Sequence, residues 1–124
     1  MSQVEIRPMV FDPSRSDFPK EPDLPDAVNM ALRASLVGWL RARLEELEGD
    51  CLVKPAAEGQ EDQGILEAVF PAMPAKELVE KLAERQVYCT VGDKNSLRFT
   101  ISAGQAFEPL DTVQAIIMDI LGIE

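Results

Sequence analysis

Residues 87–101 read VYCTVGDKNSLRFTI and carry the clearest strand pattern in the chain. From residue 97 onward apolar and polar side chains alternate, which gives one apolar face and leaves Arg98 on the other. The turn-forming residues GDKN at 92–95 separate this stretch from VYCTV. The pattern predicts an antiparallel hairpin of two strands, 87–91 and 97–101.

The elements around this hairpin are predicted from apolar spacing. Apolar residues recur with helical period in three segments, and two further short runs are rich in strand-forming residues. The predicted helices are 27–48, 75–85 and 109–121, and the predicted further strands are 51–54 and 64–70. Three helices can bury their apolar stripes together only by covering a sheet. We therefore expect a two-layer α+β fold, with a mostly antiparallel sheet of four to five strands and three helices packed largely on one face.

The first 25 residues differ from the rest because they hold five of the nine prolines. Proline fixes φ and removes an amide donor, so a helix or a central strand is excluded here. We expect a proline-rich arm over 1–25, with a short edge strand that includes Val4, Ile6 and Val10, and a single α+β domain over 26–124. Three end signals belong to the predicted helices: Asp26 as an N-cap for the first, and Gly49 and Gly122 as terminators.

Charge and hydropathy exclude several classes of function. The chain has 12 Lys and Arg against 22 Asp and Glu, a formal net charge of −10. Binding to nucleic acid or to an anionic membrane requires a basic surface, so neither partner is expected. No apolar run is long enough to span a membrane, and the first residues do not resemble a secretory signal. We expect a cytoplasmic protein.

Few residue types in this chain could act in catalysis. The absence of histidine excludes catalytic triads and the usual zinc sites, and no metal site is predicted. The two cysteines, Cys51 and Cys89, are expected to be buried small hydrophobic residues in strands. Acidic clusters at 45–48 and 58–62 suit solvated surfaces better than a pair of catalytic carboxylates. No phosphate-binding glycine loop is present.

The stretch KELVEKLAERQVYCTVGDKNSLRFTISAGQAFEPLDTVQAIIMDIL, residues 76–121, resembles a known domain. It is similar to the small C-terminal domain of fold-type I pyridoxal-phosphate enzymes, in the class V aminotransferase and cysteine desulfurase branch. The shared feature is the order of elements: a strand, a short turn, a strand with an arginine, and a helix whose first turn is acidic. With the earlier helix and strands it covers about three quarters of the chain. It implies that Arg98 binds a substrate carboxylate, which a guanidinium fork can do bidentately.

The same resemblance implies that the cofactor-binding part of the enzyme is missing. The large domain of that family, which supplies the cofactor lysine, has no counterpart in this sequence, and none of the five lysines lies in a matching context. We therefore expect no catalytic residue in this chain, and pyridoxal phosphate only if a large-domain partner supplies its site. The alternative role for Arg98 is that of a surface arginine paired with Glu67.

Two functions follow for the whole chain. The first is a non-catalytic small domain that acts as a protein-interaction or substrate-carboxylate-binding module. The second is a small acidic dimeric binding module, similar to type III secretion chaperones. Both need a protein partner, either a second copy or a larger chain, and the expected surface consists of Phe11, Phe18, Val37 and Trp39. The alternative is that Phe11 and Phe18 fold back on their own domain. Whether the chain is a fragment or a stand-alone protein stays open.

Overall fold

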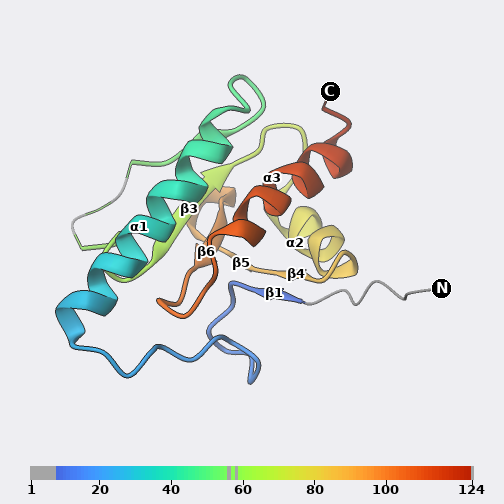
Figure 1. Cartoon of the computed structure of the whole chain (residues 1–124). Coiled ribbons are helices and arrows are strands. Elements are labelled where there is room, and N and C mark those ends of the chain that lie inside the picture. The colour runs from blue at the N-terminus through green and yellow to red at the C-terminus, as the bar shows by residue number, and fades with distance from the viewer. Residues whose placement is uncertain (1–7, 56, 58, 124) are drawn as a thin grey trace.

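The computed structural model describes residues 8–55, 57 and 59–123 (Figure 1). Within these residues α1 and α3 lie in front of a four-stranded sheet, α2 lies to its right, and a separate parallel pair of short strands lies beside it. The predicted α+β class is confirmed. The elements in chain order are β1 (Met9–Val10), α1 (Asp26–Glu45), β2 (Leu52–Val53), β3 (Ile65–Val69), α2 (Ala75–Glu84), β4 (Val87–Tyr88), β5 (Thr90–Val91), the 3₁₀ turn η1 (Asp93–Asn95), β6 (Leu97–Thr100) and α3 (Glu108–Leu121).

The main sheet is antiparallel, with strand order β2-β3-β6-β5. Its two central strands are in a register that places Leu66 opposite Phe99 and Glu67 opposite Arg98. Leu66 and Phe99 are buried under the helices, whereas Arg98 is on the opposite side of the sheet and half-exposed. An antiparallel sheet can face water on one side. The sheet therefore has a core face and an open face, and the open face carries the charged pair.

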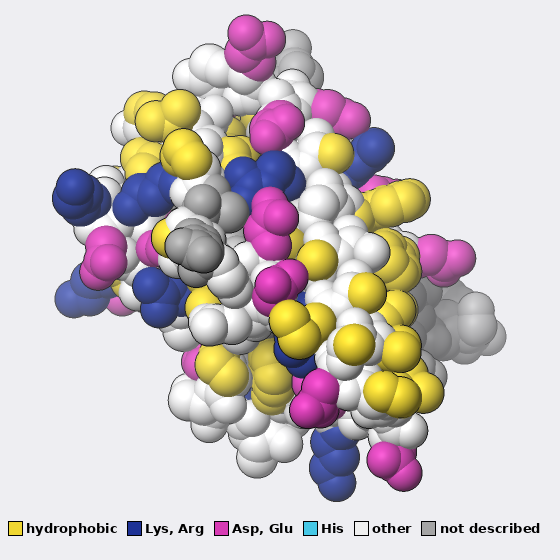
Figure 2. Space-filling view, turned by 90° about the vertical axis from the view of Figure 1, so that its left-hand side faces the viewer, with side chains coloured by type: hydrophobic (Ala, Val, Ile, Leu, Met, Phe, Trp, Pro, Cys, Tyr) yellow, Lys and Arg dark blue, Asp and Glu magenta, His cyan; other side chains and the backbone are white. Residues whose placement is uncertain are grey.

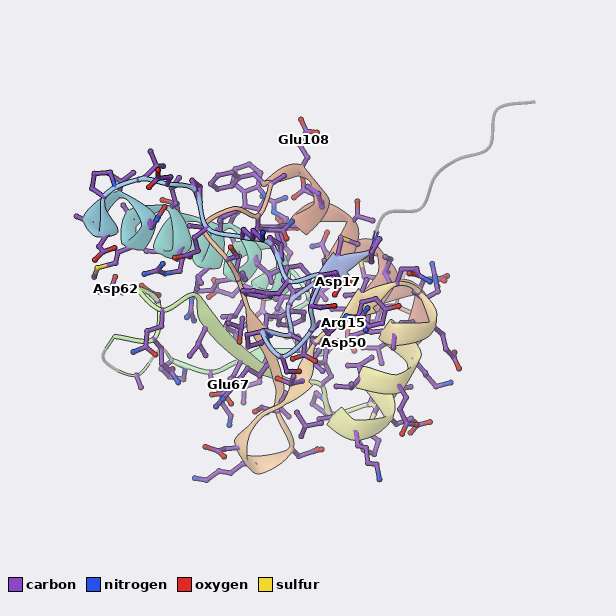
Figure 3. The ribbon with its side chains drawn as sticks, turned by 90° about the horizontal axis from the view of Figure 1, so that it is seen from below. Arg15, Asp17, Asp50, Asp62, Glu67 and Glu108 are labelled. Carbon is purple, nitrogen blue, oxygen red and sulfur yellow. The ribbon has the colours of Figure 1, made fainter. Side chains whose placement is uncertain are left out.

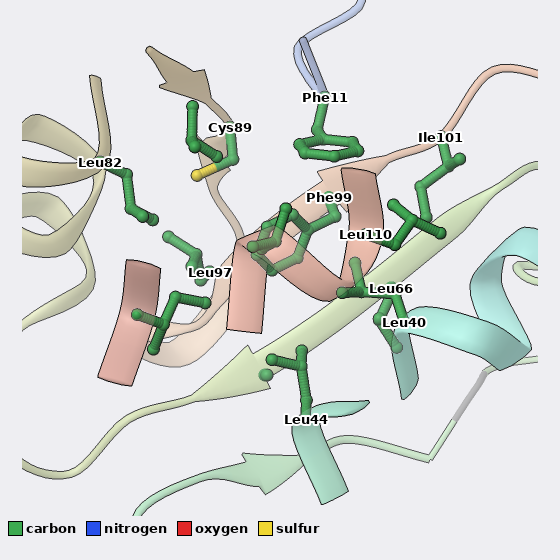
Figure 4. Packing of buried hydrophobic residues seen from close by; sticks show 14 of the residues in the cluster. Phe11, Leu40, Leu44, Leu66, Leu82, Cys89, Leu97, Phe99, Ile101 and Leu110 are labelled. Atoms are coloured by element: carbon green, nitrogen blue, oxygen red, sulfur yellow. The ribbon is translucent and has the colours of Figure 1, made fainter. Parts of the chain in front are cut away.

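The core lies between the sheet and the three helices (Figure 4). Each helix contributes a stripe of fully buried aliphatic side chains, and Phe99 of the central strand is buried among them. The buried helix residues are Leu36, Val37, Leu40 and Leu44 of α1, Leu78 and Leu82 of α2, and Leu110, Val113 and Ile117 of α3. This single contiguous cluster is what holds the sheet in place.

The predicted strand over 87–91 is wrong as a single strand. Only Thr90–Val91 pairs antiparallel with β6, so the hairpin is confirmed over these residues alone. Val87–Tyr88 instead pairs in parallel with β1. The reason is Phe11, whose amide donates to the carbonyl of Tyr88 at 2.6 Å and whose carbonyl accepts from Thr100 at 3.0 Å. The N-terminal segment is thus inserted between β4 and the end of β6.

Residues 8–25 lie against the rest of the chain. Arg33 of α1 binds both carboxylate oxygens of Glu21, at 2.6 and 2.8 Å, and the amide of Ala103 donates to the same carboxylate. Nearer β1, the guanidinium of Arg15 lies 3.6 Å from the ring centre of Tyr88. Val10 belongs to β1 as expected, whereas Val4 and Ile6 lie outside the described residues.

Two details of α1 correct the sequence analysis. Asp26 is the first residue of the helix and makes no side-chain cap, because Pro25 occupies the N-cap position. The helix ends at Glu45, since a tighter turn follows in which the amide of Leu47 donates to Leu44. Gly49, with φ of +91°, comes after that turn. At α3 the predicted terminator is confirmed, because Gly122 adopts the left-handed conformation as the C-cap.

Of the helices in the described part of the chain, none combines the length and the apolar character that a membrane span requires.

Candidate functional site

Arg98 and Glu67 form the centre of the open face of the sheet. They are directly opposite each other on β6 and β3, and Nη2 of Arg98 lies 3.6 Å from Oε2 of Glu67. Figure 3 places Glu67 on the side of β3 that faces away from α1. Two neighbouring central strands hold both backbones, so the pair is positioned by the most constrained part of the sheet.

Glu67 is held more firmly than its partner. Its Oε1 accepts hydrogen bonds from the hydroxyl of Ser96 at 2.9 Å and from the amide of Asp93 at 3.3 Å. Burial alone would raise the pKa of Glu67, but the bond from Ser96, the charge of Arg98, the Asp93 amide and the charge of Lys54 together lower it. Glu67 is therefore an ionised carboxylate. Gly92 permits this approach, because a Cβ there would collide with Oε1.

Arg98 keeps unused donors. Its side chain is 36% exposed, and its contact with Glu67 is longer than the usual charge-assisted hydrogen bond. Its Nε is buried and has no hydrogen-bond partner among the residues that the structure describes. A buried donor without an acceptor costs free energy. The exposed part of the guanidinium, at its terminal nitrogens, remains available to an oxygen ligand from outside the chain.

Sequence analysis named both residues of this pair, and the carboxylate-binding role expected of Arg98 stays a prediction. Arg98 was predicted from the resemblance, and its pairing with Glu67 was the alternative role; the structure contains that pair. Sequence reasoning missed Ser96 and Lys54, which support the site through Glu67 and through the carbonyl of Asp93, 2.7 Å from Nζ of Lys54. Glu67 was the feature of the sequence that could have indicated them, because it is the single charged residue in the apolar run 65–70 and a buried carboxylate needs partners.

The predicted interaction residues fall in three different places. Phe11 and Val37 are fully buried, so neither lies on a surface of the described chain. Val37 is three residues before Leu40 on the same side of α1, and it therefore shares that buried stripe. Phe18 is half-buried and lines a cavity of about 310 Å³ under the arm.

Trp39 is exposed, with 42% of its surface accessible. Its indole Nε1 donates to Oδ1 of Asp111 at 3.0 Å, and its ring makes an edge contact with Phe107 at 5.6 Å between centroids. The guanidinium of Arg43 lies 5.8 Å from the ring centre. One face of the indole is therefore fixed against α3, while the rest of the ring remains open.

The cysteines offer no nucleophile. Burial raises the pKa of both Cys51 and Cys89 to about 12, so the thiolate that reacts is suppressed. Both cysteines are free thiols.

Neither a metal nor the cofactor of the resembled family fits the described residues. Residues 8–55, 57 and 59–123 contain no cluster of three or more Cys, Asp or Glu that could hold a metal ion. Neither the 310 Å³ cavity nor a second one of about 520 Å³ beside β1 and α3 is lined by a lysine. A Schiff base with pyridoxal phosphate needs a lysine in such a cavity, so neither of these two cavities is a site for it.

The fold and the site together define a two-layer α+β domain whose open sheet face is centred on an arginine–glutamate pair. No protein-family model matches the sequence, and no curated protein is similar to it in sequence. Solved structures are similar in fold. A NifS-like protein matches 77% of this chain with a TM-score of 0.65 and 17% identity, and this match covers 28% of that protein.

A second match is the apo structure of a cysteine desulfurase from Thermococcus onnurineus NA1. It covers 77% of this chain and 26% of that enzyme, with a TM-score of 0.66 and 13% identity. The chain thus spans about a quarter of the length of these two structures. The shared fold agrees with the predicted small domain of the class V aminotransferase fold.

Proposed function

We propose that this chain is a non-catalytic small domain that docks against a larger protein unit and contributes Arg98 to the binding of a carboxylate. The observation that carries the proposal is the likeness in fold to about a quarter of a cysteine desulfurase and of a NifS-like protein. The remainder of a ligand site would come from the larger unit, whether joined to this chain or separate.

The geometry around Arg98 supports the binding role. A carboxylate is the natural ligand for a guanidinium that has spare donors and a fixed backbone. Glu67 limits the affinity, because an incoming carboxylate meets an arginine that is already partly neutralised. The isolated chain is therefore expected to bind weakly, in about the millimolar range. Burial of the site by a larger unit would strengthen the same contact by lowering the local dielectric.

The proposal can be tested by NMR titration of the arginine Nε–Hε signals with the amino acid alanine. The Arg98 signal should shift saturably, because a carboxylate bound at the exposed terminal nitrogens changes the electronic environment of the whole guanidinium, including Nε. Alaninamide, which lacks the carboxylate, should produce no such shift. Arg85 serves as the internal control, since it is exposed and already pairs with Asp119 at 2.6 Å. Equal, linear shifts at Arg85 and Arg98 would show ionic strength effects only and contradict the proposal.

The second function, a small acidic dimeric binding module, draws on a different observation. Trp39 and Val28 are both exposed on α1, at 42% and 43%, although tryptophan and valine favour buried positions. An exposed apolar helix face is suited to protein contacts, whatever role the open face of the sheet has.

A further inference from the structure

Glu21 of the proline-rich arm is bound by donors from two distant segments of the chain. Nη1 of Arg33, on α1, donates to both oxygens of its carboxylate, at 2.6 and 2.8 Å. The amide of Ala103, between β6 and α3, donates to one of these oxygens at 3.0 Å. A guanidinium and a backbone amide are donors that recognise carboxylates in general. The same two groups could therefore hold a carboxylate from outside the chain, and we call them the Arg33 site.

The donors of the Arg33 site are fixed by contacts other than the ion pair. Nε of Arg33 donates to the carbonyl of Asp62 at 2.6 Å, and only 18% of the arginine side chain is exposed. Ala103 is buried, so its amide is held by the packing around it. Donors that are positioned before a ligand arrives reduce the free energy lost to ordering when it binds.

A cavity lies beside the ion pair. It is the cavity of about 310 Å³ that Phe18 lines, and both Arg33 and Glu21 are part of its wall. Phe18 and Ile101 supply apolar surface, and Ser102 supplies a hydroxyl. Sites for small molecules combine an apolar wall with a few convergent polar groups, and this volume is at the lower end of their range.

The hydroxyl of Ser102 is an unused donor in this wall. Ser102 is 2% exposed, and its oxygen accepts from the amide of Gly104 at 3.0 Å. Within residues 8–55, 57 and 59–123 its proton has no acceptor. A buried donor without an acceptor costs free energy, and an oxygen of a ligand in the cavity would remove that cost.

The charge of Arg33 is not free, so a ligand has to compete for it. Basic and acidic side chains lie next to one another on the side of the molecule that Figure 2 shows. Glu21 can be displaced, because 39% of its side chain is exposed and residues 23–25 of the arm are exposed as well. Ion pairs with this degree of exposure contribute little to stability.

We propose that the Arg33 site and the adjoining cavity bind a small organic carboxylate with a short apolar chain, and that Glu21 is its internal competitor. The ligand carboxylate takes the place of Glu21 on Arg33 and on the amide of Ala103, and the apolar chain lies against Phe18 and Ile101. Because the ligand and Glu21 exclude each other, binding of the ligand releases the arm at this point.

The expected affinities follow from this competition. A tethered carboxylate competes at an effective concentration of about millimolar or more. The original chain should therefore bind a free carboxylate weakly, and removal of Glu21 should tighten binding by about tenfold. The proposal goes beyond the proposed function, because Arg98 does not line this cavity.

NMR titration with butanoate tests the proposal on the original chain, Glu21→Ala and a control variant. The Nε–Hε signal of Arg33 is the reporter, since its hydrogen bond to Asp62 protects the proton from exchange. Glu21→Ala should show a saturable shift, with a dissociation constant about tenfold below that of the original chain. Asp23→Ala removes an exposed carboxylate from the same arm and should stay within about twofold of the original chain. Butanamide, which has no carboxylate, should shift none of them.

Two results would overturn the proposal. One is a folded Glu21→Ala chain whose Arg33 signal shows no saturable shift up to about 100 mM butanoate. The other is equal affinity in Glu21→Ala and in the original chain, because Glu21 would then not compete. Circular dichroism shows whether Glu21→Ala is folded, and Glu21→Gln, which removes the charge but keeps the size, gives the same comparison if it is not. The Arg98 shift with alanine should be equal in all these chains, so the two sites are tested separately.

Discussion

Replacement of Phe11 by alanine should lower the free energy of unfolding by about 3–5 kcal/mol. Phe11 has no exposed surface, and its ring packs edge-on against Phe99 with centroids 5.5 Å apart (Figure 4). Its removal leaves a cavity at the centre of the core and loosens the strand contacts to Tyr88 and Thr100. Total stability of a domain this size is about 5–15 kcal/mol, so the change is a large fraction of the total.

The control for this variant is Phe18→Ala in the same proline-rich segment. Phe18 is only half-buried, so its loss should cost about 1 kcal/mol. Urea unfolding followed by circular dichroism gives both values. Equal losses at the two positions, or a loss under about 1 kcal/mol at Phe11, would contradict the insertion of the N-terminal segment into the core.

Gly64→Ala should be equally disruptive for a different reason. Gly64 is the last residue of the turn before β3, with φ of +80°, and its carbonyl accepts from the amide of Ile101 at 2.7 Å. A Cβ at this position would collide with the backbone carbonyl of Ile101, which no rotamer change can relieve. The chain must separate there or rotate away from its left-handed conformation. We expect a loss of at least about 3 kcal/mol.

Gly49→Ala measures the cost of the left-handed conformation without the cost of a collision. Gly49 has a similar φ of +91°, but a Cβ there would meet nothing within 4 Å. The stability of this variant should fall by the conformational cost alone, about 1–2 kcal/mol. If thermal unfolding gives the same loss at both glycines, the close contact between Gly64 and Ile101 is wrong.

The fold could be predicted from sequence where local pattern and tertiary packing agree. The alternation over 97–101 and the helical stripes each specify a buried face without knowledge of the partner, and these elements are confirmed. The prediction of a single strand over 87–91 was wrong, because the pairing of this segment depends on Phe11, a residue far away in the chain. A local pattern cannot show that a distant segment inserts between two strands.

The leucine stripe of α1 shows a second limit. Apolar spacing in the predicted helix 27–48 places Val28 in one row with Leu32, Leu36 and Leu40, yet 43% of the surface of Val28 is exposed. Residues four apart differ by about 40° around a helix, so a row of such steps winds away from the core. Val28 ends about 120° from Leu40 and reaches the outer side. The candidate site could be predicted only in part. The family resemblance indicated Arg98 from its place in the sequence. The contacts of Ser96 and Lys54 could not be predicted, because they depend on which residues the fold brings together.

The proposal that this chain is a non-catalytic small domain is tested most directly by incubation with pyridoxal phosphate, borohydride reduction and mass spectrometry of the peptides. All five lysines lie in the described part of the chain, and neither described cavity contains one. The account predicts low, scattered labelling over the lysines and no aldimine absorbance after dialysis. Stoichiometric labelling of one lysine, with an absorbance band that survives dialysis, would contradict it.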